Sequence, residues 1–293
     1  MKIAAGLDTL ERLKGVAELL SDFRFVQPEV ELVHVLERLG EETVRPPEGI
    51  QPDLITRFLR MQEEEADRLL SGGSSELAQQ GLECKTTRLT GFSGNRIVKH
   101  ASETKTDLLA LGSSGQGAIE SALLGSVGRK ALLSAECSVL IAKDYQRKKQ
   151  GLTIVVATDH SPYAKRCLDK FVSWRPQGVT RSVVVTVYSA QLVHAMTSVV
   201  SPLKGDVSSW VRSLLEKENE VAVTQLASLG GPCTSRVETG SVGDTLERVM
   251  KEEQADVLVL GAQGHGFIDR LLLGSVSLEQ SLRRPYSTLV VRA

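Results

Sequence analysis

The stretch at residues 256–276, DVLVLGAQGHGFIDRLLLGSV, decides the fold because the same pattern stands earlier, at residues 107–127, as DLLALGSSGQGAIESALLGSV. The shared positions are Gly112, Gly115, Gly125 and Ser126 in the earlier copy and Gly261, Gly264, Gly274 and Ser275 in the later one, 149 positions apart. The 293-residue chain is therefore two copies of one unit. Each copy follows an apolar run with a glycine-spaced loop, which predicts main-chain donors suited to a phosphate.

Length and composition describe a globular protein of two domains. The chain is about twice the commonest domain length of roughly 100–150 residues, and 41% hydrophobic with 24% charged residues is typical of soluble domains. The net charge of -1 gives no long-range attraction to nucleic acid or anionic lipid, so we expect neither as a partner. No apolar run reaches the roughly 18 residues of a membrane span. The start MKIAAGLDTLERLKG becomes charged too early for a signal peptide, and we expect a cytoplasmic protein.

The four cysteines, Cys84, Cys137, Cys167 and Cys233, are scattered along the chain. They form no C-x-x-C pair, and no histidine stands near them at a metal-ligand spacing. The pattern predicts buried thiols, with neither a metal site nor a disulfide framework.

Short β-rich runs alternate with longer amphipathic stretches in both halves. The expected strands are residues 2–7, 29–35, 83–89, 107–111 and 138–142, and then 152–158, 181–188, 233–238, 256–260 and 287–291. In the second half, Ser161 is suited to cap a helix with Pro162 at its first position. Further helices are expected at residues 207–229, with apolar positions at Trp210, Leu214, Leu215 and Val221, at residues 243–254, and from about Gly274.

Strands separated by helices predict parallel pairing with right-handed crossovers. The fold class is therefore α/β, and we expect two doubly wound, mainly parallel five-stranded sheets of Rossmann-like strand order 3-2-1-4-5 with helices on both faces. The expected domains are residues 1–146 and 151–293, joined by a basic, polar linker at 143–151. The proline-rich stretch 43–52 is interpreted as a loop inside the first domain.

In an open parallel sheet, a ligand binds outside the carboxyl ends of the strands, where the strand order reverses. Asp159 closes the first strand of the second half, and Gly261 closes the fourth. If these strands flank the reversal, a carboxylate and a ring of main-chain amides face one cleft. A helix that begins near Gly274 adds unpaired N–H groups suited to an anion.

These residues resemble the universal stress protein family in its tandem form. The resemblance rests on the spacing G-x2-G-x9-G-S after an apolar strand, the LLLGSV helix entry and the aspartate that closes the first strand. It covers nearly the whole chain, is strongest at residues 256–291, and is weakest at residues 36–89. The complete spacing occurring twice is far more specific than a lone G-x-x-G.

The resemblance implies ATP as the cofactor, with or without Mg²⁺. In the second half, Asp159 and the backbone of Val187 would contact adenine, and the residues that would hold ribose and phosphates are Gly261, Gly264, His265, Gly274, Ser275 and Val276. The corresponding positions of the first half are Asp8, Val35, Gly112, Gly115, Gly125, Ser126 and Val127.

The two loops depart from the family pattern in their charges. The position after the second glycine, often basic in the family, is Gln116 in one copy and His265 in the other. Glu120 and Ser121 stand where the second copy has Asp269 and Arg270. The first loop thus supplies a carboxylate and no cation, so we expect ATP to bind more tightly to the second half.

Each candidate also has a structural interpretation. The glycines could serve only tight turns, Asp8 and Asp159 could cap the following helices, and His265 could be solvated. Ser126 and Ser275 have no base placed by the sequence to activate them, so we interpret them as anion contacts or caps. Trp174 and Trp210 are expected in the core, and Glu63, Glu64 and Glu65 on a solvated helix face.

The leading hypothesis is an ATP-binding regulatory protein whose nucleotide state is recognised by an unidentified protein partner, and not an enzyme. The alternatives are a slow adenine-nucleotide hydrolase or adenylating enzyme, and an interaction scaffold without nucleotide. The apolar last strands of each half, CSVLIAK and STLVVRA, lie at a sheet edge in the expected order. Exposed edges favour pairing, so we also predict association of the two domains and a homo-oligomer.

Overall fold

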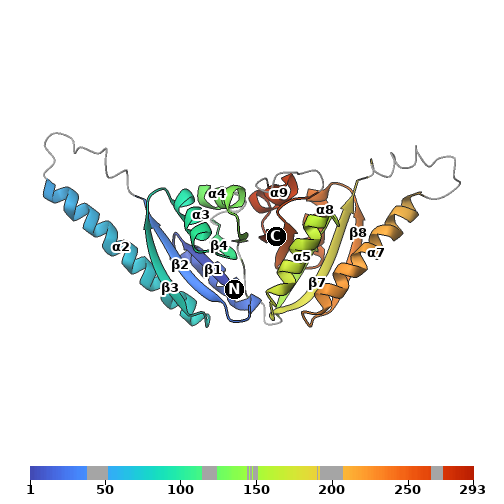
Figure 1. Ribbon diagram of the computed structural model, residues 1–293, viewed down its shortest axis with the longest axis horizontal. Helices are drawn as coiled ribbons and strands as arrows, with labels where there is room; N and C mark the ends of the chain where they lie inside the picture. Colours follow the sequence, from blue (N-terminus) through green and yellow to red (C-terminus); the bar gives the residue numbers. More distant parts are fainter. Residues whose placement is uncertain are drawn as a thin grey trace. The chain divides into compact units, whose positions relative to one another are not determined.

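The computed structural model describes residues 1–37, 52–113, 124–143, 145, 147, 151–189, 191, 207–264 and 273–293. The chain divides into two compact units (Figure 1). The first consists of Met1–Ser21 and Gln27–Gln146, and the second of Asp22–Val26 and Arg147–Ala293.

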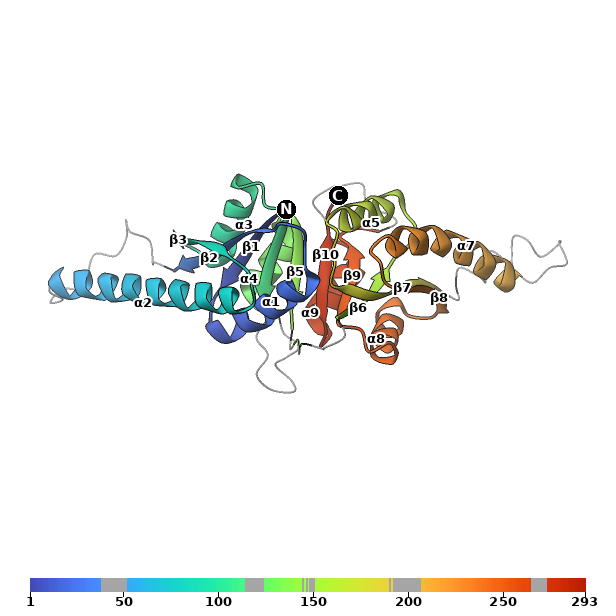
Figure 2. The same ribbon diagram turned by 90° about the horizontal axis from the view of Figure 1, so that it is seen from below.

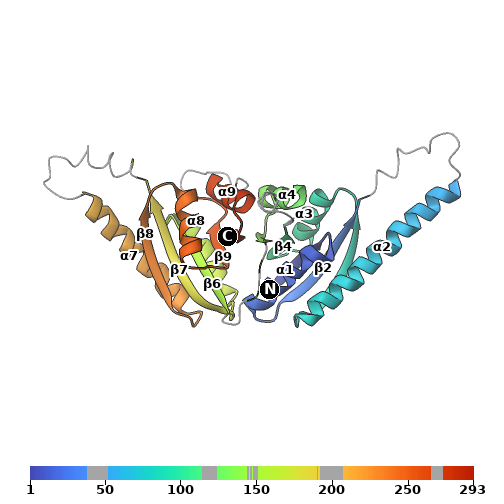
Figure 3. The same cartoon turned by 180° about the vertical axis from the view of Figure 1, so that it is seen from behind.

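The first unit alternates strands and helices as predicted. Its elements are β1 (Lys2–Leu7), α1 (Leu10–Phe23), β2 (Glu29–Leu36), α2 (Pro52–Gln79), β3 (Cys84–Thr90), α3 (Ser93–Glu103), β4 (Leu108–Gly112), α4 (Ser126–Ser134) and β5 (Ser138–Ala142). The strands pair in parallel in the order β3-β2-β1-β4-β5. Helix α2 runs along β2 and β3 (Figure 1, Figure 3).

The second unit repeats this order. Its elements are β6 (Leu152–Ala157), α5 (Pro162–Ser173), β7 (Val179–Tyr188), α7 (Val207–Ala227), β8 (Cys233–Thr239), α8 (Val242–Glu252), β9 (Val257–Gly261), α9 (Ser275–Arg283) and β10 (Ser287–Val291). The strands pair in parallel in the order β8-β7-β6-β9-β10. Figure 2 shows α5 and α7 on one face of these strands and α8 on the other. The α/β class and the strand order 3-2-1-4-5 are confirmed in both halves, with the reversal between the first and fourth strands.

A buried aliphatic layer lies between the strands of the second unit and helix α8. Val155, Val183 and Leu258, from three neighbouring strands, are inaccessible to solvent. They pack against Leu246 and Val249, which lie three residues apart on one face of α8. Full burial of such a side chain contributes roughly 1.5–3 kcal/mol, so this layer holds α8 against the strands.

Helix α5 begins as the sequence predicts. Ser161 is its N-cap, and the hydroxyl oxygen of Ser161 accepts a hydrogen bond from the backbone N–H of Ala164 at 3.1 Å. Pro162 occupies the first turn, where its missing N–H removes no helical hydrogen bond. This cap fixes the point at which the chain turns from β6 into α5.

One prediction about α7 is wrong. Trp210 was expected in the core, but its side chain is 55% exposed, and Leu214 and Val221 are also exposed. The buried face of α7 instead carries Val207, Val211, Asn219, Ala222 and Leu226. An apolar spacing of three and four residues can describe either face of a helix, and Trp210 lies on the outer one. Trp174 is buried, as predicted.

The prediction of buried thiols holds for half of the cysteines. Cys137 and Cys167 are buried, whereas Cys84 and Cys233 are only half-buried. The two exceptions begin β3 and β8, the outermost strands on that side of each unit's order. Within the described ranges, no helix is long and apolar enough to cross a bilayer. The same ranges contain no group of three or more potential metal-ligating side chains.

Candidate functional site

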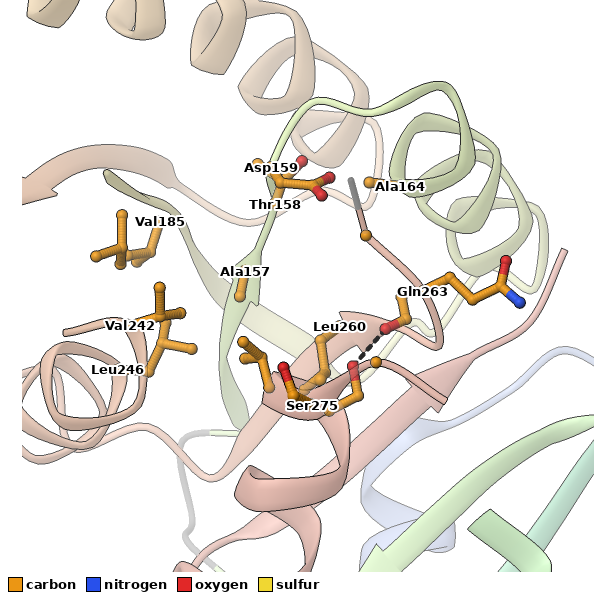
Figure 4. Close-up of a pocket in the computed structure, with 16 residues that line it drawn as sticks. Ala157, Thr158, Asp159, Ala164, Val185, Val242, Leu246, Leu260, Gln263 and Ser275 are labelled. Atoms are coloured by element: carbon orange, nitrogen blue, oxygen red, sulfur yellow. Dashed lines mark hydrogen bonds between the residues drawn. The ribbon is translucent and has the colours of Figure 1, made fainter. Parts of the chain in front are cut away.

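A cavity of about 310 Å³ lies at the carboxyl ends of β6 and β9 in the second unit (Figure 4). Its lining combines an apolar wall with a polar rim: Val185, Val187, Val242, Leu246, Leu260 and Val276 on the one hand, and Thr158, Asp159, Gln263, Gly264, Gly274 and Ser275 on the other. The fold therefore brings together every described residue that the sequence assigned to the second site. We call this cavity the second cleft.

Asp159 lies directly beyond the end of β6, on one side of the second cleft (Figure 4). Its Oδ1 accepts a hydrogen bond from the backbone N–H of Ser161 at 3.0 Å. A Cβ atom built on Gly264 would lie 2.7 Å from its Oδ2, so the loop after β9 returns to the carboxylate, and a larger residue there would have to displace the Asp159 side chain. Ser161, and not Asp159, is the N-cap of α5, and Asp159 holds the backbone N–H of that cap residue.

The opposite side of the second cleft is the start of α9. Gly274 is the N-cap residue, and its backbone N–H donates to the carbonyl of Ala262 at 2.7 Å. The next residues, Ser275 and Val276, line the cavity in the first helical turn, where backbone N–H groups have no intrahelical acceptor. The hydroxyl of Ser277 donates to the carbonyl of Gly261 at 2.7 Å and ties the helix start to the end of β9. The arrangement presents main-chain donors and a positive helix end to the cleft.

The wall between these two sides is aliphatic. Val185 comes from β7, Val242 and Leu246 from α8, and Leu260 from β9 (Figure 4). Val242 and Val276 pack against the buried layer described above, so the wall is a continuation of the core. A flat apolar ring fits such a wall, while the polar ends of the same ligand reach Asp159 and α9.

The first unit has a cavity of about 520 Å³ at the corresponding place, which we call the first cleft. The sequence-predicted residues that line it are Asp8, Val35, Gly112, Gly125, Ser126 and Val127. Residues that the sequence did not single out also line it, among them Arg12, Glu37 and Ser93. The two halves thus share the frame of the cleft and differ in its rim.

The charges of the first cleft are arranged differently. The guanidinium of Arg12 donates to Oδ2 of Asp8 in an ion pair one helical turn apart. Glu37 accepts a hydrogen bond from the backbone N–H of Ser93 at 3.2 Å, and hydrogen bonds from Ser93 lower the pKa of that carboxyl. The side chain of Thr9 accepts from the backbone N–H of Arg12 at 3.3 Å, so Thr9 takes the capping contact in α1 that was considered for Asp8.

The sequence contained a signal for Arg12. It stands four residues after Asp8, a spacing at which opposite charges meet on a helix. The position of Glu37 had no such signal, because its partner is 56 residues away. Gly115 and His265, together with Gln116, Glu120, Ser121, Asp269 and Arg270, lie outside the described residues.

The sequence model of the universal stress protein family matches residues 2–143 and again residues 152–292. Over 135 residues the chain is 30% identical to universal stress protein MJ0531 of Methanocaldococcus jannaschii, an alignment that covers 46% of this chain and 75% of that protein. The crystal structure of a universal stress protein from Archaeoglobus fulgidus has the same fold, with a TM-score of 0.68 and 19% identity over 99% of this chain and 98% of that one. A functionally unknown protein from Pseudomonas aeruginosa, PA1789, aligns with a TM-score of 0.58 and 15% identity over 99% of this chain and 92% of that chain.

Proposed function

The chain belongs to the universal stress protein family, and on that basis we propose that it is an ATP-binding regulatory protein whose nucleotide state a partner protein recognises. In this proposal the second cleft is the tighter site. The proposal includes a cytoplasmic location and self-association, as expected from the sequence.

One observation carries the proposal: Asp159 and the start of α9 lie on opposite sides of one cavity, with an aliphatic wall between them (Figure 4). Adenosine polyphosphates have the same succession of groups, with an aromatic base, a hydroxylated sugar and an anionic tail. The base would pack on Val185, Val242 and Leu246. An anion at a helix N-terminus gains typically 0.3–1 kcal/mol per contact, so the phosphates would lie toward Gly274 and Ser275.

The chemistry of the second cleft favours binding over turnover. Among its described lining residues, Asp159 is the one charged side chain. Fast phosphoryl transfer needs cations that stabilise the charge on the transferring group, usually a lysine, an arginine or Mg²⁺ held by carboxylates. Backbone donors and one carboxylate suit a site that holds a nucleotide and signals its presence. Mg²⁺ would enter bound to the phosphates.

The test is a titration of the full chain with Mg²⁺-ATP, observed by NMR of labelled valine methyl groups. Val185 and Val187 report on the second cleft, and Val33 and Val35 report on the first. We expect saturable shifts in the second cleft at lower ATP concentrations than in the first. Asp159→Asn should weaken binding in the second cleft about tenfold, since it removes a charged hydrogen-bond acceptor.

The matched control is Asp169→Asn, which neutralises an exposed carboxylate on α5 that accepts from Gln225 at 2.7 Å. It should leave both affinities unchanged. Absence of ATP-dependent shifts in both clefts at millimolar ATP contradicts the proposal. Rapid, repeated conversion of ATP to ADP in the same samples would favour the hydrolase alternative instead.

A further inference from the structure

A chain of polar side chains leads from the loop of Asp159 into the interior of the second unit. His160 follows Asp159 directly, and its Nε2 lies 2.9 Å from the hydroxyl oxygen of Thr186 on β7. That hydroxyl lies 2.7 Å from Oδ1 of Asn219 on α7. The amide nitrogen of Asn219 lies 3.3 Å from the carbonyl oxygen of Arg236 on β8. Four segments of the second unit are therefore joined by consecutive hydrogen bonds.

The direction of these hydrogen bonds follows from their last member. A backbone carbonyl only accepts, so the NH₂ group of Asn219 must face Arg236, and its Oδ1 must face Thr186. Thr186 then donates its single hydroxyl proton to Asn219, and its oxygen accepts from His160. His160 must carry a proton on Nε2, so one tautomer of the ring completes the chain.

Burial makes this chain rigid. Asn219 is fully buried and Thr186 is 3% exposed, so neither can exchange its partner for water without opening the fold. The far end of the chain holds an unusual backbone. His160 has a φ of 58°, in the left-handed region that non-glycine residues seldom adopt. Its backbone N–H donates to the hydroxyl of Thr158 at 3.0 Å. Asp159 thus lies between Thr158 and His160, which are hydrogen-bonded to each other, and the His160 ring is also bonded to Thr186.

Among the described residues of the first unit, the corresponding positions form no such chain. The counterpart of Thr186 is His34, because they directly precede the matched cleft residues Val187 and Val35. Nδ1 of His34 lies 2.9 Å from the carbonyl oxygen of Leu7. The counterpart of Asn219 is Leu70 on α2. In both helices the residues three and seven positions further on are buried, at 222 and 226 in α7 and at 73 and 77 in α2. Leu70 is buried and apolar, so it offers no hydrogen bond to the strand beside it.

We propose that the chain from Asn219 through Thr186 to His160 positions Asp159 for an adenine nucleotide, and that it links occupancy of the second cleft to α7. This inference rests on the proposed function and adds a device that, among the described residues, is formed in the second half and not at the matched positions of the first. His160, Thr186 and Asn219 are positioning residues, since none of them lines the described cavity. Preorganisation of Asp159 would make the second cleft the tighter one without any additional contact to the ligand.

The ionisation of His160 agrees with this arrangement. Burial lowers the pKa of its imidazole, while the negative charge of Glu218 and hydrogen bonding of the ring to the side-chain oxygen of Asn219 raise it. Lys165 on α5 lowers this pKa further and Asp159 raises it. A lowered pKa keeps the ring neutral near pH 7, the form in which a single tautomer donates to Thr186.

The experiment compares two substitutions at one buried position in the full chain. Thr186→Val keeps the shape of the side chain and removes the hydroxyl, whereas Thr186→Ser keeps the hydroxyl. We expect Thr186→Val to weaken ATP binding in the second cleft about tenfold and Thr186→Ser to stay within about twofold of the native chain. The first cleft, followed through Val33 and Val35, should not change in either variant.

Thr288→Val is the control for a purely structural effect. Thr288 is fully buried in β10 and donates to the hydroxyl of Ser281 at 3.0 Å, so this variant also loses one buried hydroxyl. It should leave ATP affinity unchanged. Nitrogen-15 spectra of the imidazole rings provide a second measurement: His160 should be protonated on Nε2 in the native and Thr186→Ser chains and lose this preference in Thr186→Val.

Each outcome has one meaning. A tenfold loss in Thr186→Val alone, with the tautomer change, supports the inference. Equal ATP affinity in Thr186→Val and the native chain, or an equal loss in Thr288→Val, overturns it while the proposed function stands. A native chain that binds ATP in neither cleft overturns both.

Discussion

The two clefts of this chain share their frame and differ at their rims. Both are built from the ends of the first and fourth strands and the start of the helix after the fourth strand. In the second cleft the described lining holds one charged side chain, Asp159, beside a continuous aliphatic wall. In the first cleft, Asp8 is engaged by Arg12, Glu37 adds a second carboxylate, and the first residue of the wall helix is a serine.

This difference shows which positions a duplicated fold constrains. The buried strands, LLALG in β4 and VLVLG in β9, must fill a core and therefore stay alike. Rim residues contact solvent or ligand, so a change there costs little stability and changes what the cleft binds. We therefore expect equal folds and unequal affinities from the two halves.

The largest expected effect is on stability, from alanine substitutions at the matched glycines that end the fourth strand of each half. A Cβ atom on Gly112 would lie 2.5 Å from the backbone oxygen of Arg12, whereas one on Gly261 would lie 3.3 Å from its nearest atom, the oxygen of Gln263. Gly112→Ala must displace the backbone of α1 and should destabilise the first half by about 2–3 kcal/mol. Gly261→Ala should cost less than about 1 kcal/mol in the second half.

Hydrogen exchange followed by mass spectrometry gives a separate opening free energy for peptides of β4 and β9. The two alanine variants are each other's controls, because they occupy matched positions. If both variants lower the opening free energy by the same amount, then the close approach of α1 to Gly112 does not distinguish the two halves.

An intermediate effect concerns the wall. Val242 begins α8 and Ser93 begins α3, at matched places in the two clefts. Loss of apolar area costs roughly 0.8 kcal/mol per methylene. Val242→Ser should therefore weaken ATP binding in the second cleft about fivefold, and Ser93→Val should strengthen it in the first. The valine methyl titration measures the ATP affinity of both variants. If neither Val242→Ser nor Ser93→Val changes the affinity of its cleft, the wall does not contact the base.

The smallest expected effect is the dependence of the second half on pH. Burial lowers the pKa of His160 in the folded state, so the unfolded state binds more protons as the pH falls below the ordinary value of about 6.5. Acidification from pH 7 to 5 should therefore destabilise the second half. His160→Asn removes this titration and tolerates the left-handed backbone, so its stability should fall less over the same range.

Both tryptophans, Trp174 and Trp210, lie in the second half, so urea unfolding followed by their fluorescence reports on that half alone. The range from pH 7 to pH 5 lies above the pKa of carboxyls such as Glu238, because hydrogen-bonded ion pairs with arginines lower that pKa below its ordinary value of about 4.5. Parallel pH curves for the native and His160→Asn chains would exclude His160 as the source of the dependence.

Much of the architecture could be predicted because the evidence for it is local. Apolar runs, the cap at Ser161 and the repeat itself predicted the strands and helices, and the order 3-2-1-4-5, expected for a Rossmann-like sheet, is confirmed by the structure. The matched glycines and the aspartates were found because they follow these strands directly. The error at Trp210 has the opposite cause: periodicity gives a helix two distinguishable faces, but it does not say which one meets the sheet.

The rest of the site depends on residues that converge from distant segments. Glu37 meets Ser93 over 56 positions, and Thr186 meets Asn219 over 33. No spacing rule connects such pairs, because the turns and crossovers between them set the final distance.

By itself, the sequence determined that this chain is a duplicated α/β protein with an aspartate and a glycine loop at matched strand ends. That information is encoded in residues close together along the chain, through strand and helix periodicity and backbone freedom at glycine. Only the tertiary structure decided that Arg12 engages Asp8 in one half, and that a buried chain from Asn219 to His160 stands behind Asp159 in the other. Hydrogen bonds and ion pairs act over a few ångströms, so their partners are known only once the fold has brought the segments together.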